Sequence, residues 1–194
     1  MTKQKIIEDI SNKNNGTVRL AELIEAGISR QYCLEYLKNK EYEKIARGIY
    51  LSPDAWGDDF YVIHLKYHKA VFSHETALYL LELADREPVK YTVTLPHGYK
   101  VDVLTKSGIM VYTSIAERYQ VGIRQILTPG GHVVPCYDAE RTICDVFRSE
   151  IDAQDKQVAV KEYLKENKNI PKLMEYAKIF RVDKKIKQYL EALL

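Results

Sequence analysis

The feature that most constrains the fold of this chain is a helical segment that runs directly into a β-hairpin, within residues 27–53. Gly27 permits a sharp turn before the helix, and the hydroxyl of Ser29 can cap the free backbone N–H groups of its first turn. The dipeptide Arg47-Gly48 then predicts a tight turn between two short strands, with a cation at its tip. A helix followed by such a hairpin is typical of a recognition helix and its wing.

The neighbouring segments supply the other parts of a winged helix. Apolar residues at helical spacing predict a helix over residues 5–11, and residues 17–19 can form a small strand that pairs with the wing. Residues 20–26 then form the first helix of a helix-turn-helix, and the wing strands cover residues 42–46 and 49–51. The predicted order is helix, strand, helix, turn, helix and two-stranded wing, which favours binding to DNA.

The spacing of apolar residues predicts which faces of the two helices are buried. The residues expected to face the core are Leu20, Leu23 and Ile24 from the first helix and Ile28, Leu34 and Leu37 around the second. The opposite face of the second helix is expected to present Arg30, Gln31, Cys33, Glu35 and Lys38.

Arginine and glutamine can each form two hydrogen bonds with one base edge, whereas cations on a wing suit phosphates or a minor groove. The candidate DNA-binding residues are therefore Arg19, Ser29, Arg30, Gln31, Lys38, Lys44 and Arg47. The alternative is a winged helix that serves only as a packing module in a protein-interaction domain. The order of the elements and the basic wing favour DNA.

Charge is low in total and uneven along the chain. The formal net charge of +2 excludes the large excess of cations that drives strong DNA binding regardless of sequence. Residues 1–52 hold nine Lys and Arg against seven Asp and Glu, residues 53–150 hold ten against thirteen, and residues 151–194 hold ten against seven. The acidic middle segment is therefore a poor surface for DNA.

A break rich in proline, glycine and aspartate at residues 53–58 predicts a linker, with Trp56 as a candidate anchor. It separates a DNA-binding domain, residues 1–52, from a second domain, residues 53–194. The expected fold is thus a winged helix-turn-helix followed by a mixed α/β domain with a small sheet and C-terminal helices.

The second domain alternates between helical and strand-like patterns. Strands are predicted over residues 91–95, 109–113, 121–127 and 132–137, and together they suggest a mixed sheet. Helices are predicted over residues 59–68, 73–81, 139–148, 156–164, 171–180 and 184–194. Ser73 and Asp138 are expected to cap two of these helices. Arg141 and Asp145, four residues apart, can form an ion pair on the helix surface, or Arg141 can pair with another element from a buried position.

The chain contains three cysteines, Cys33, Cys136 and Cys144, with no C-x-x-C pair. This number and spacing argue against a disulfide framework and a structural zinc site, and they fit a reducing cytoplasm. The polar N-terminus does not resemble a signal peptide, and no apolar run approaches the ~20 residues that a membrane span needs. We therefore expect a cytoplasmic protein with no membrane partner.

Three motifs follow one another along the chain. They are ARGIYLSP at residues 46–53, VFSHETALYLLEL at residues 71–83 with YTVTLPHGYK at residues 91–100, and VPCYDAERTICDVFR at residues 134–148. In this order and spacing they resemble the AbiEi family of bacterial abortive-infection antitoxins, which look like transcriptional repressors fused to a toxin-neutralising domain. The resemblance runs over nearly the whole chain.

The resemblance implies a functional partner, the AbiEii nucleotidyltransferase toxin of a type IV toxin–antitoxin system for phage defence, without a stable complex between the two. It also implies that the first domain represses the operon by binding inverted repeats and that the second carries antitoxicity. With the lysine-rich C-terminal helices, it makes Lys178, Arg181, Lys184 and Lys185 candidate antitoxicity residues, with RNA as a candidate ligand. The alternative is a solvated lysine-rich surface without a partner.

Several residues also fit an enzyme, namely a metal-dependent nuclease targeted by the winged helix. Asp102, Asp138 and Glu140 could form an acidic Mg²⁺ site, although the supporting lysine of such sites is missing. His74 begins an H-E pair, but Leu78 stands where the H-E-x-x-H motif needs its second histidine. We therefore expect no catalytic residue, metal or cofactor. A third possibility is a regulator whose second domain senses a small molecule.

Overall fold

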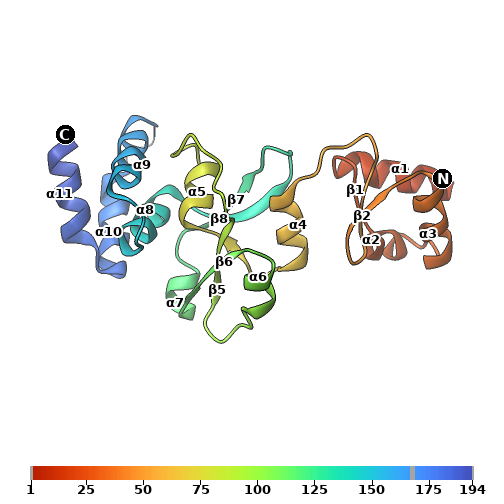
Figure 1. Cartoon of the computed structure of the whole chain (residues 1–194), viewed down its shortest axis with the longest axis horizontal. Coiled ribbons are helices and arrows are strands. Elements are labelled where there is room, and N and C mark those ends of the chain that lie inside the picture. The colour runs from red at the N-terminus through yellow and green to blue at the C-terminus, as the bar shows by residue number, and fades with distance from the viewer. Residues whose placement is uncertain (1, 167–168, 194) are drawn as a thin grey trace. The chain divides into compact units, whose positions relative to one another are not determined.

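The chain folds into two compact units. The computed structural model describes residues 2–166 and 169–193. The N-terminal unit consists of residues 1–66 together with a distant loop, residues 127–133, and the C-terminal unit holds the rest of the chain. Figure 1 shows helices combined with two small sheets, so the predicted class, a winged helix followed by a mixed α/β domain, is confirmed.

The N-terminal unit has the order of elements expected of a winged helix. It contains α1 (Lys3–Lys13), β1 (Thr17–Arg19), α2 (Leu20–Glu25), α3 (Arg30–Asn39), β2 (Glu43–Ala46), β3 (Ile49–Leu51) and α4 (Asp59–Lys66). The strands form an antiparallel sheet in the order β1-β3-β2, so β1 pairs with the wing as predicted. At the wing tip Gly48 has a φ of 73°, which a residue with a Cβ adopts only at a cost.

The core of the N-terminal unit lies among α1, α2, α3 and β1. It contains Ile7, Val18, Leu20, Leu23, Ile28, Cys33, Tyr36 and Leu37. The predicted register of α3 is wrong in one respect, because Cys33 is fully buried whereas Leu34 is 37% exposed. Ile24 on α2, also expected in the core, is 42% exposed. Tyr36 takes the inner position instead, since its ring packs in the core while its hydroxyl donates to Glu8 on α1 at 3.1 Å.

A buried polar network joins the distant loop of this unit to its winged helix. Oδ2 of Asp58 lies 2.7 Å from Nδ1 of His132 and also accepts a hydrogen bond from the hydroxyl of Thr128. Nε2 of His132 lies 2.9 Å from the carbonyl oxygen of Asn14, at the end of α1. Both imidazole nitrogens of His132 therefore lie within hydrogen-bond distance of an oxygen atom.

The N-terminal unit extends past the predicted linker. Oδ1 of Asp58 accepts a hydrogen bond from the backbone N–H of Tyr61 at 3.1 Å and so caps α4, which belongs to this unit. Trp56 is 92% exposed, so its expected role as an anchor is wrong. The functional boundary at residue 52 stays a prediction.

The C-terminal unit is built on a five-stranded sheet. Its elements up to the last strand are β4 (Val71–Phe72), α5 (His74–Leu80), β5 (Thr92–Pro96), α6 (Asp102–Lys106), β6 (Met110–Ser114), α7 (Ala116–Tyr119), β7 (Ile123–Leu127) and β8 (Val133–Tyr137). The strand order is β6-β5-β4-β8-β7. The β5–β6 and β4–β8 pairs are parallel and the β4–β5 pair is antiparallel, so the predicted mixed sheet is confirmed. The short helices α6 and α7 were not predicted.

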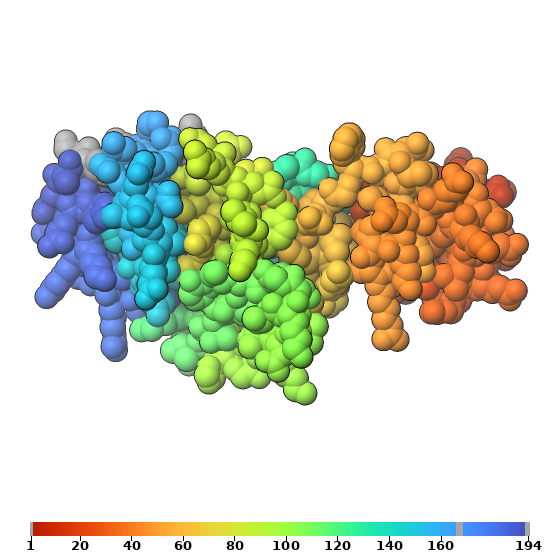
Figure 2. Space-filling view, viewed as in Figure 1, coloured from red at the N-terminus to blue at the C-terminus, as the bar shows by residue number. Residues whose placement is uncertain are grey.

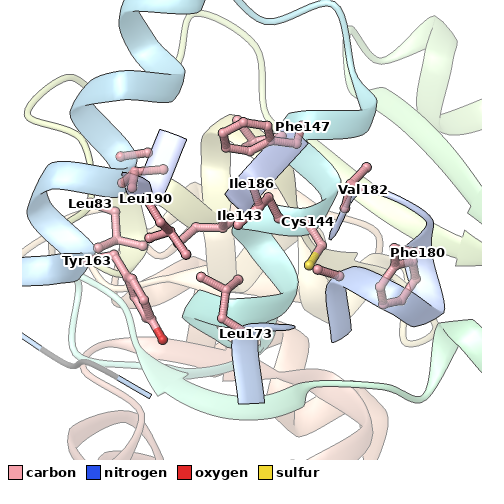
Figure 3. Packing of buried hydrophobic residues seen from close by; sticks show 14 of the residues in the cluster. Leu83, Ile143, Cys144, Phe147, Tyr163, Leu173, Phe180, Val182, Ile186 and Leu190 are labelled. Atoms are coloured by element: carbon pink, nitrogen blue, oxygen red, sulfur yellow. The ribbon is translucent and has the colours of Figure 1, made fainter. Parts of the chain in front are cut away.

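Four helices complete this unit: α8 (Ala139–Arg148), α9 (Ala153–Glu166), α10 (Ile170–Phe180) and α11 (Asp183–Leu193). Helix α8 is the central one, because every residue from Glu140 to Phe147 is buried. Figure 3 shows its Ile143 among Leu173 of α10 and Ile186 and Leu190 of α11. The predicted amphipathic helices therefore pack their apolar faces onto α8. Within the described ranges, no helix is both long and apolar enough to cross a bilayer.

The ion pair between Arg141 and Asp145 forms, but it is buried rather than on the helix surface. Nε of Arg141 donates to Oδ2 of Asp145 at 2.9 Å, and the guanidinium also donates to the carbonyl oxygen of Val121 at 3.1 Å. The rings of Tyr137 and Phe180 each have their centre 4.1 Å from the guanidinium carbon. Arg141 therefore ties α8 to the sheet and to α10.

The two predicted helix caps of this unit differ in outcome. Asp138 caps α8 as expected, since its carboxylate accepts from the backbone N–H of Arg141 at 2.9 Å. Ser73 precedes α5 but makes no side-chain cap bond. Its hydroxyl instead accepts from Thr94 at 2.9 Å and lies 3.0 Å from Nδ1 of His74. Thr94 and His74 are buried beside the Ser73 hydroxyl, and they would lose this hydrogen-bond partner if the hydroxyl capped α5 instead.

Asp58→Ala should destabilise the N-terminal unit by about 1–3 kcal/mol, because it leaves the buried polar groups of His132 and Thr128 without their hydrogen-bond partner. Urea unfolding followed by circular dichroism would give the free energy. Hydrogen exchange of peptides from α1 to α3 would locate the loss. Asp54→Ala, at an exposed carboxylate nearby, is the matched control. Equal small effects of the two substitutions would contradict a structural role of Asp58.

His74 should make the protein less stable in mild acid. Burial, followed by the charges of Arg141 and Arg148, lowers the pKa of His74 from 6.5 to about 3. The unfolded chain therefore binds more protons than the folded protein between these two values, and stability should fall as the pH drops through that range. His74 has a φ of 50°, which asparagine tolerates, so His74→Asn should flatten this part of the stability profile. An unchanged slope in His74→Asn would assign the acid sensitivity to other groups.

Candidate nucleic-acid interface

The outward face of α3 carries three of the residues predicted to contact DNA. Arg30 and Gln31, predicted to read bases, and Lys38 are all exposed. Arg30 and Lys38 are eight residues apart, so they lie on one line along the helix with Leu34 between them. Within the described residues, the three polar side chains form no hydrogen bond or ion pair, so their donors are available to a ligand.

The first turn of α3 offers a second kind of donor. Ser29 occupies the cap position, as predicted, but its hydroxyl makes no cap hydrogen bond. The hydroxyl and the first backbone N–H groups of this ten-residue helix therefore remain open at its positive end. Such a helix end suits a phosphate oxygen.

The wing places two more cations at the surface. Lys44 lies on β2 and Arg47 lies in the turn, and both are exposed without an ion-pair partner among the described residues. The pairing of β2 with β3 shifts between Lys44 and Ala46, which marks a bulge beside the tip. In Figure 2 the orange part of the chain, which includes the wing, lies at the surface. The wing can therefore reach a phosphate backbone or a minor groove.

Arg19 differs from the other predicted cations. Its Nε lies 3.4 Å from Oε2 of Glu22, and the same carboxylate oxygen accepts a hydrogen bond from Asn14 at 3.2 Å. The side chain is still 43% exposed. Arg19 is therefore partly neutralised, and its charge is less available to DNA than the charges of α3 and the wing.

Hydrogen bonds from two tyrosines hold α3 and the wing against α1. Tyr36 donates to Glu8, and Tyr42, just before β2, donates to the hydroxyl of Ser11 at 2.9 Å. Burial, followed by the bond to Glu8, raises the pKa of Tyr36 to about 12, so this hydroxyl keeps its proton. The position of α3 is thereby fixed before any ligand binds.

Two of the three acidic residues considered for a nuclease have structural partners. The ammonium of Lys172 lies 2.8 Å from Oδ2 of Asp138 and 3.0 Å from Oε2 of Glu140. Burial alone would lower the pKa of Lys172, but its bonds to these carboxylates raise it above the usual range. Asp102 is exposed at the start of α6. Among the described residues, no cluster of three or more His, Cys, Asp or Glu is arranged to hold a metal ion.

The cysteines are also placed for packing. All three are free and buried. Burial raises the pKa of the Cys136 and Cys144 thiols far above the usual range, so neither provides a thiolate at neutral pH. His74, which raised the question of a metal motif, is buried and stacks on Tyr112 with ring centres 3.7 Å apart.

The predicted antitoxicity residues surround the junction of α10 and α11. Lys178 lies in the last turn of α10, Arg181 caps it in a left-handed conformation, and Lys184 and Lys185 lie in the first turn of α11. All four side chains are exposed. A cation is electrostatically unfavourable at a helix N-terminus, so helix stability does not explain Lys184 and Lys185.

Sequence reasoning missed two features of the N-terminal unit and its interface. Leu34 was assigned to the core, although it lies between the cations of α3. Asp58 and His132 are 74 positions apart, and no local pattern connects them. Only the acidic and aromatic character of residues 56–61 could have indicated a buried anchor there.

Comparison with known proteins finds a family match within the N-terminal unit. Residues 5–53 match the model of a family described as a transcriptional regulator, the AbiEi antitoxin. The N-terminal winged helix is therefore similar to that of AbiEi regulators. The match includes the first of the three sequence motifs and ends before the second, so it supports a regulator and antitoxin role without reaching the C-terminal unit.

A solved structure supports the fold of the whole chain. The RV2827C protein from Mycobacterium tuberculosis superposes with a TM-score of 0.50 at 11% sequence identity, over 93% of this chain and 75% of that one. At this identity the likeness concerns the fold alone. No curated protein matches the chain by sequence.

If α3 reads bases, Arg30→Ala or Gln31→Ala should weaken binding to the operator by about 1–3 kcal/mol while changing binding to unrelated DNA little. Lys44→Ala and Arg47→Ala should instead weaken all sequences alike and reduce the salt dependence. Fluorescence anisotropy with operator and scrambled duplexes at several salt concentrations would separate the two classes. Lys66→Ala, at an exposed lysine of α4, is the control. Wild-type operator affinity in the Arg30→Ala, Gln31→Ala double variant would refute the assignment of α3.

Proposed function

We propose that this protein is the antitoxin of a type IV toxin–antitoxin system and the repressor of its own operon. The observation that carries the proposal is the AbiEi match over residues 5–53, on a winged helix in which Arg30, Gln31 and Lys38 of α3 have no partner among the described residues. The proposed toxin is a nucleotidyltransferase of the AbiEii kind, with no stable complex between the two proteins. The proposed setting is phage defence in the bacterial cytoplasm.

The repressor activity rests on the N-terminal unit. Base contacts from Arg30 and Gln31 would select the operator, and contacts to phosphates from Ser29, Lys38, Lys44 and Arg47 would set the register. One winged helix covers one half-site. An operator with inverted repeats would therefore bind two copies of the chain, related by the symmetry of the DNA.

The antitoxin activity is assigned to the C-terminal unit. Lys178, Arg181, Lys184 and Lys185 form a cationic cluster on α10 and α11, which suits an anionic partner. A nucleotidyltransferase acts on nucleotides or nucleic acid, so an RNA shared with the toxin is the partner that fits this cluster. Cations provide such binding with a steep dependence on salt.

The two activities should be separable in cells that carry the neighbouring toxin gene and a reporter fused to the operon promoter. The wild-type chain should protect the cells and silence the reporter. The Arg30→Ala, Gln31→Ala variant should lose repression by at least ten-fold and still protect, because its C-terminal unit is unchanged. The Lys178→Glu, Lys184→Glu, Lys185→Glu variant should repress normally and lose protection, since charge reversal repels an anionic partner.

A matched control reverses three exposed lysines elsewhere in the C-terminal unit, Lys100, Lys106 and Lys161, and should keep both activities. Circular dichroism would confirm that each variant is folded. Full protection by the Lys178→Glu, Lys184→Glu, Lys185→Glu variant would show that the cationic cluster is a solvated surface without a role in antitoxicity. A wild-type chain that neither protects nor represses would overturn the proposed function itself.

A further inference from the structure

Leu34 stands out on the surface of α3 because it is a large apolar side chain that the core leaves outside. The inner face of the helix is filled by Cys33, Tyr36 and Leu37, all buried. Leu34 is 37% exposed and lies one turn after Arg30 and one turn before Lys38. An apolar group therefore interrupts a line of cations on the helix that faces the proposed DNA.

The charges around Leu34 indicate which partner covers it. A second copy that packed symmetrically on this ridge would bring Arg30 and Lys38 of one chain against those of the other, and like charges repel at such distances. The major groove of DNA has the opposite charge and the width to admit a helix. Charge complementarity thus favours DNA over another copy of the chain.

Within the major groove, one base offers an apolar group. Guanine, cytosine and adenine present hydrogen-bond donors and acceptors on this edge and carry no methyl group, whereas thymine adds its C5-methyl group. We propose that Leu34 contacts the methyl group of a thymine in the operator and so selects thymine at that position. This inference rests on the proposed function, because it assumes that α3 enters the groove.

The test removes only the methyl group. The operator is first defined with the wild-type, full-length chain by selection from a random duplex library, and each thymine is then replaced in turn by deoxyuridine. Loss of one buried methyl group should weaken wild-type binding about four-fold at one position per half-site, the equivalent of ~0.8 kcal/mol. Leu34→Ala should bind the normal operator more weakly and show no further loss on the deoxyuridine probe. Leu34→Met, with a similar volume, should restore part of the methyl effect.

Ile24→Ala is the matched control, since Ile24 is an exposed aliphatic residue on the neighbouring helix α2. The Ile24→Ala variant should keep the full methyl effect. If this variant lost the methyl effect, the assignment to Leu34 would be overturned. The wild-type chain could select an operator and yet bind equally well after every replacement of thymine by deoxyuridine. That result would overturn the inference and leave the proposed function intact. It depends on the wild-type chain alone, so it does not require any variant to fold. Failure of the wild-type chain to select any sequence would overturn the proposed function. A change in the oligomeric state of free Leu34→Ala, measured by sedimentation, would assign Leu34 to a contact between copies and overturn the inference.

Discussion

The buried carboxylate of Asp58 determines how far the N-terminal unit extends along the chain. A winged helix of about 50 residues buries a limited core, so such a domain is only marginally stable by itself. Asp58 caps α4 and pairs with His132, and His132 in turn contacts the carbonyl oxygen of Asn14 at the end of α1. Glu8 and Ser11 on α1 also accept hydrogen bonds from the hydroxyls of Tyr36 and Tyr42. The support of α3 therefore depends on a residue from the distant loop.

The sequence predicts the order of elements better than the faces of the helices. Glycines at required turns and the spacing of apolar residues locate α2, α3 and the wing without reference to the rest of the chain. The face of α3 is ambiguous, because Tyr32, Cys33, Leu34, Tyr36 and Leu37 are all apolar or amphipathic. The hydrogen bond from Tyr36 to Glu8 on α1 and the packing of Cys33 in the core resolve the ambiguity. The sequence predicted the exposed position of the cations correctly, because charged side chains are rarely buried. The exposed position of Leu34 was missed, because an apolar side chain was assumed to be buried.

In the C-terminal unit, the charged residues of the third motif fix the packing. Arg141 is fully buried, and its charge is balanced by Asp145 and by the faces of two aromatic rings. Asp138 caps α8 with one oxygen and binds Lys172 of α10 with the other. A motif that resembles an acidic active site therefore positions α10. Because α10 continues into the cationic cluster at its C-terminal end, the same contacts determine where that cluster lies.

The low net charge of the chain affects how the interface can work. A protein with a net charge of +2 gains little from non-specific attraction to phosphates, so few copies would be held on unrelated DNA. Affinity for the proposed operator would then have to come from local contacts that differ between sequences. The proposed hydrogen bonds from α3 would weaken little with salt once water is excluded, and contact of an apolar side chain with a methyl group is not screened by salt. An apolar residue between two cations is therefore better suited to selection among sequences than a third cation would be.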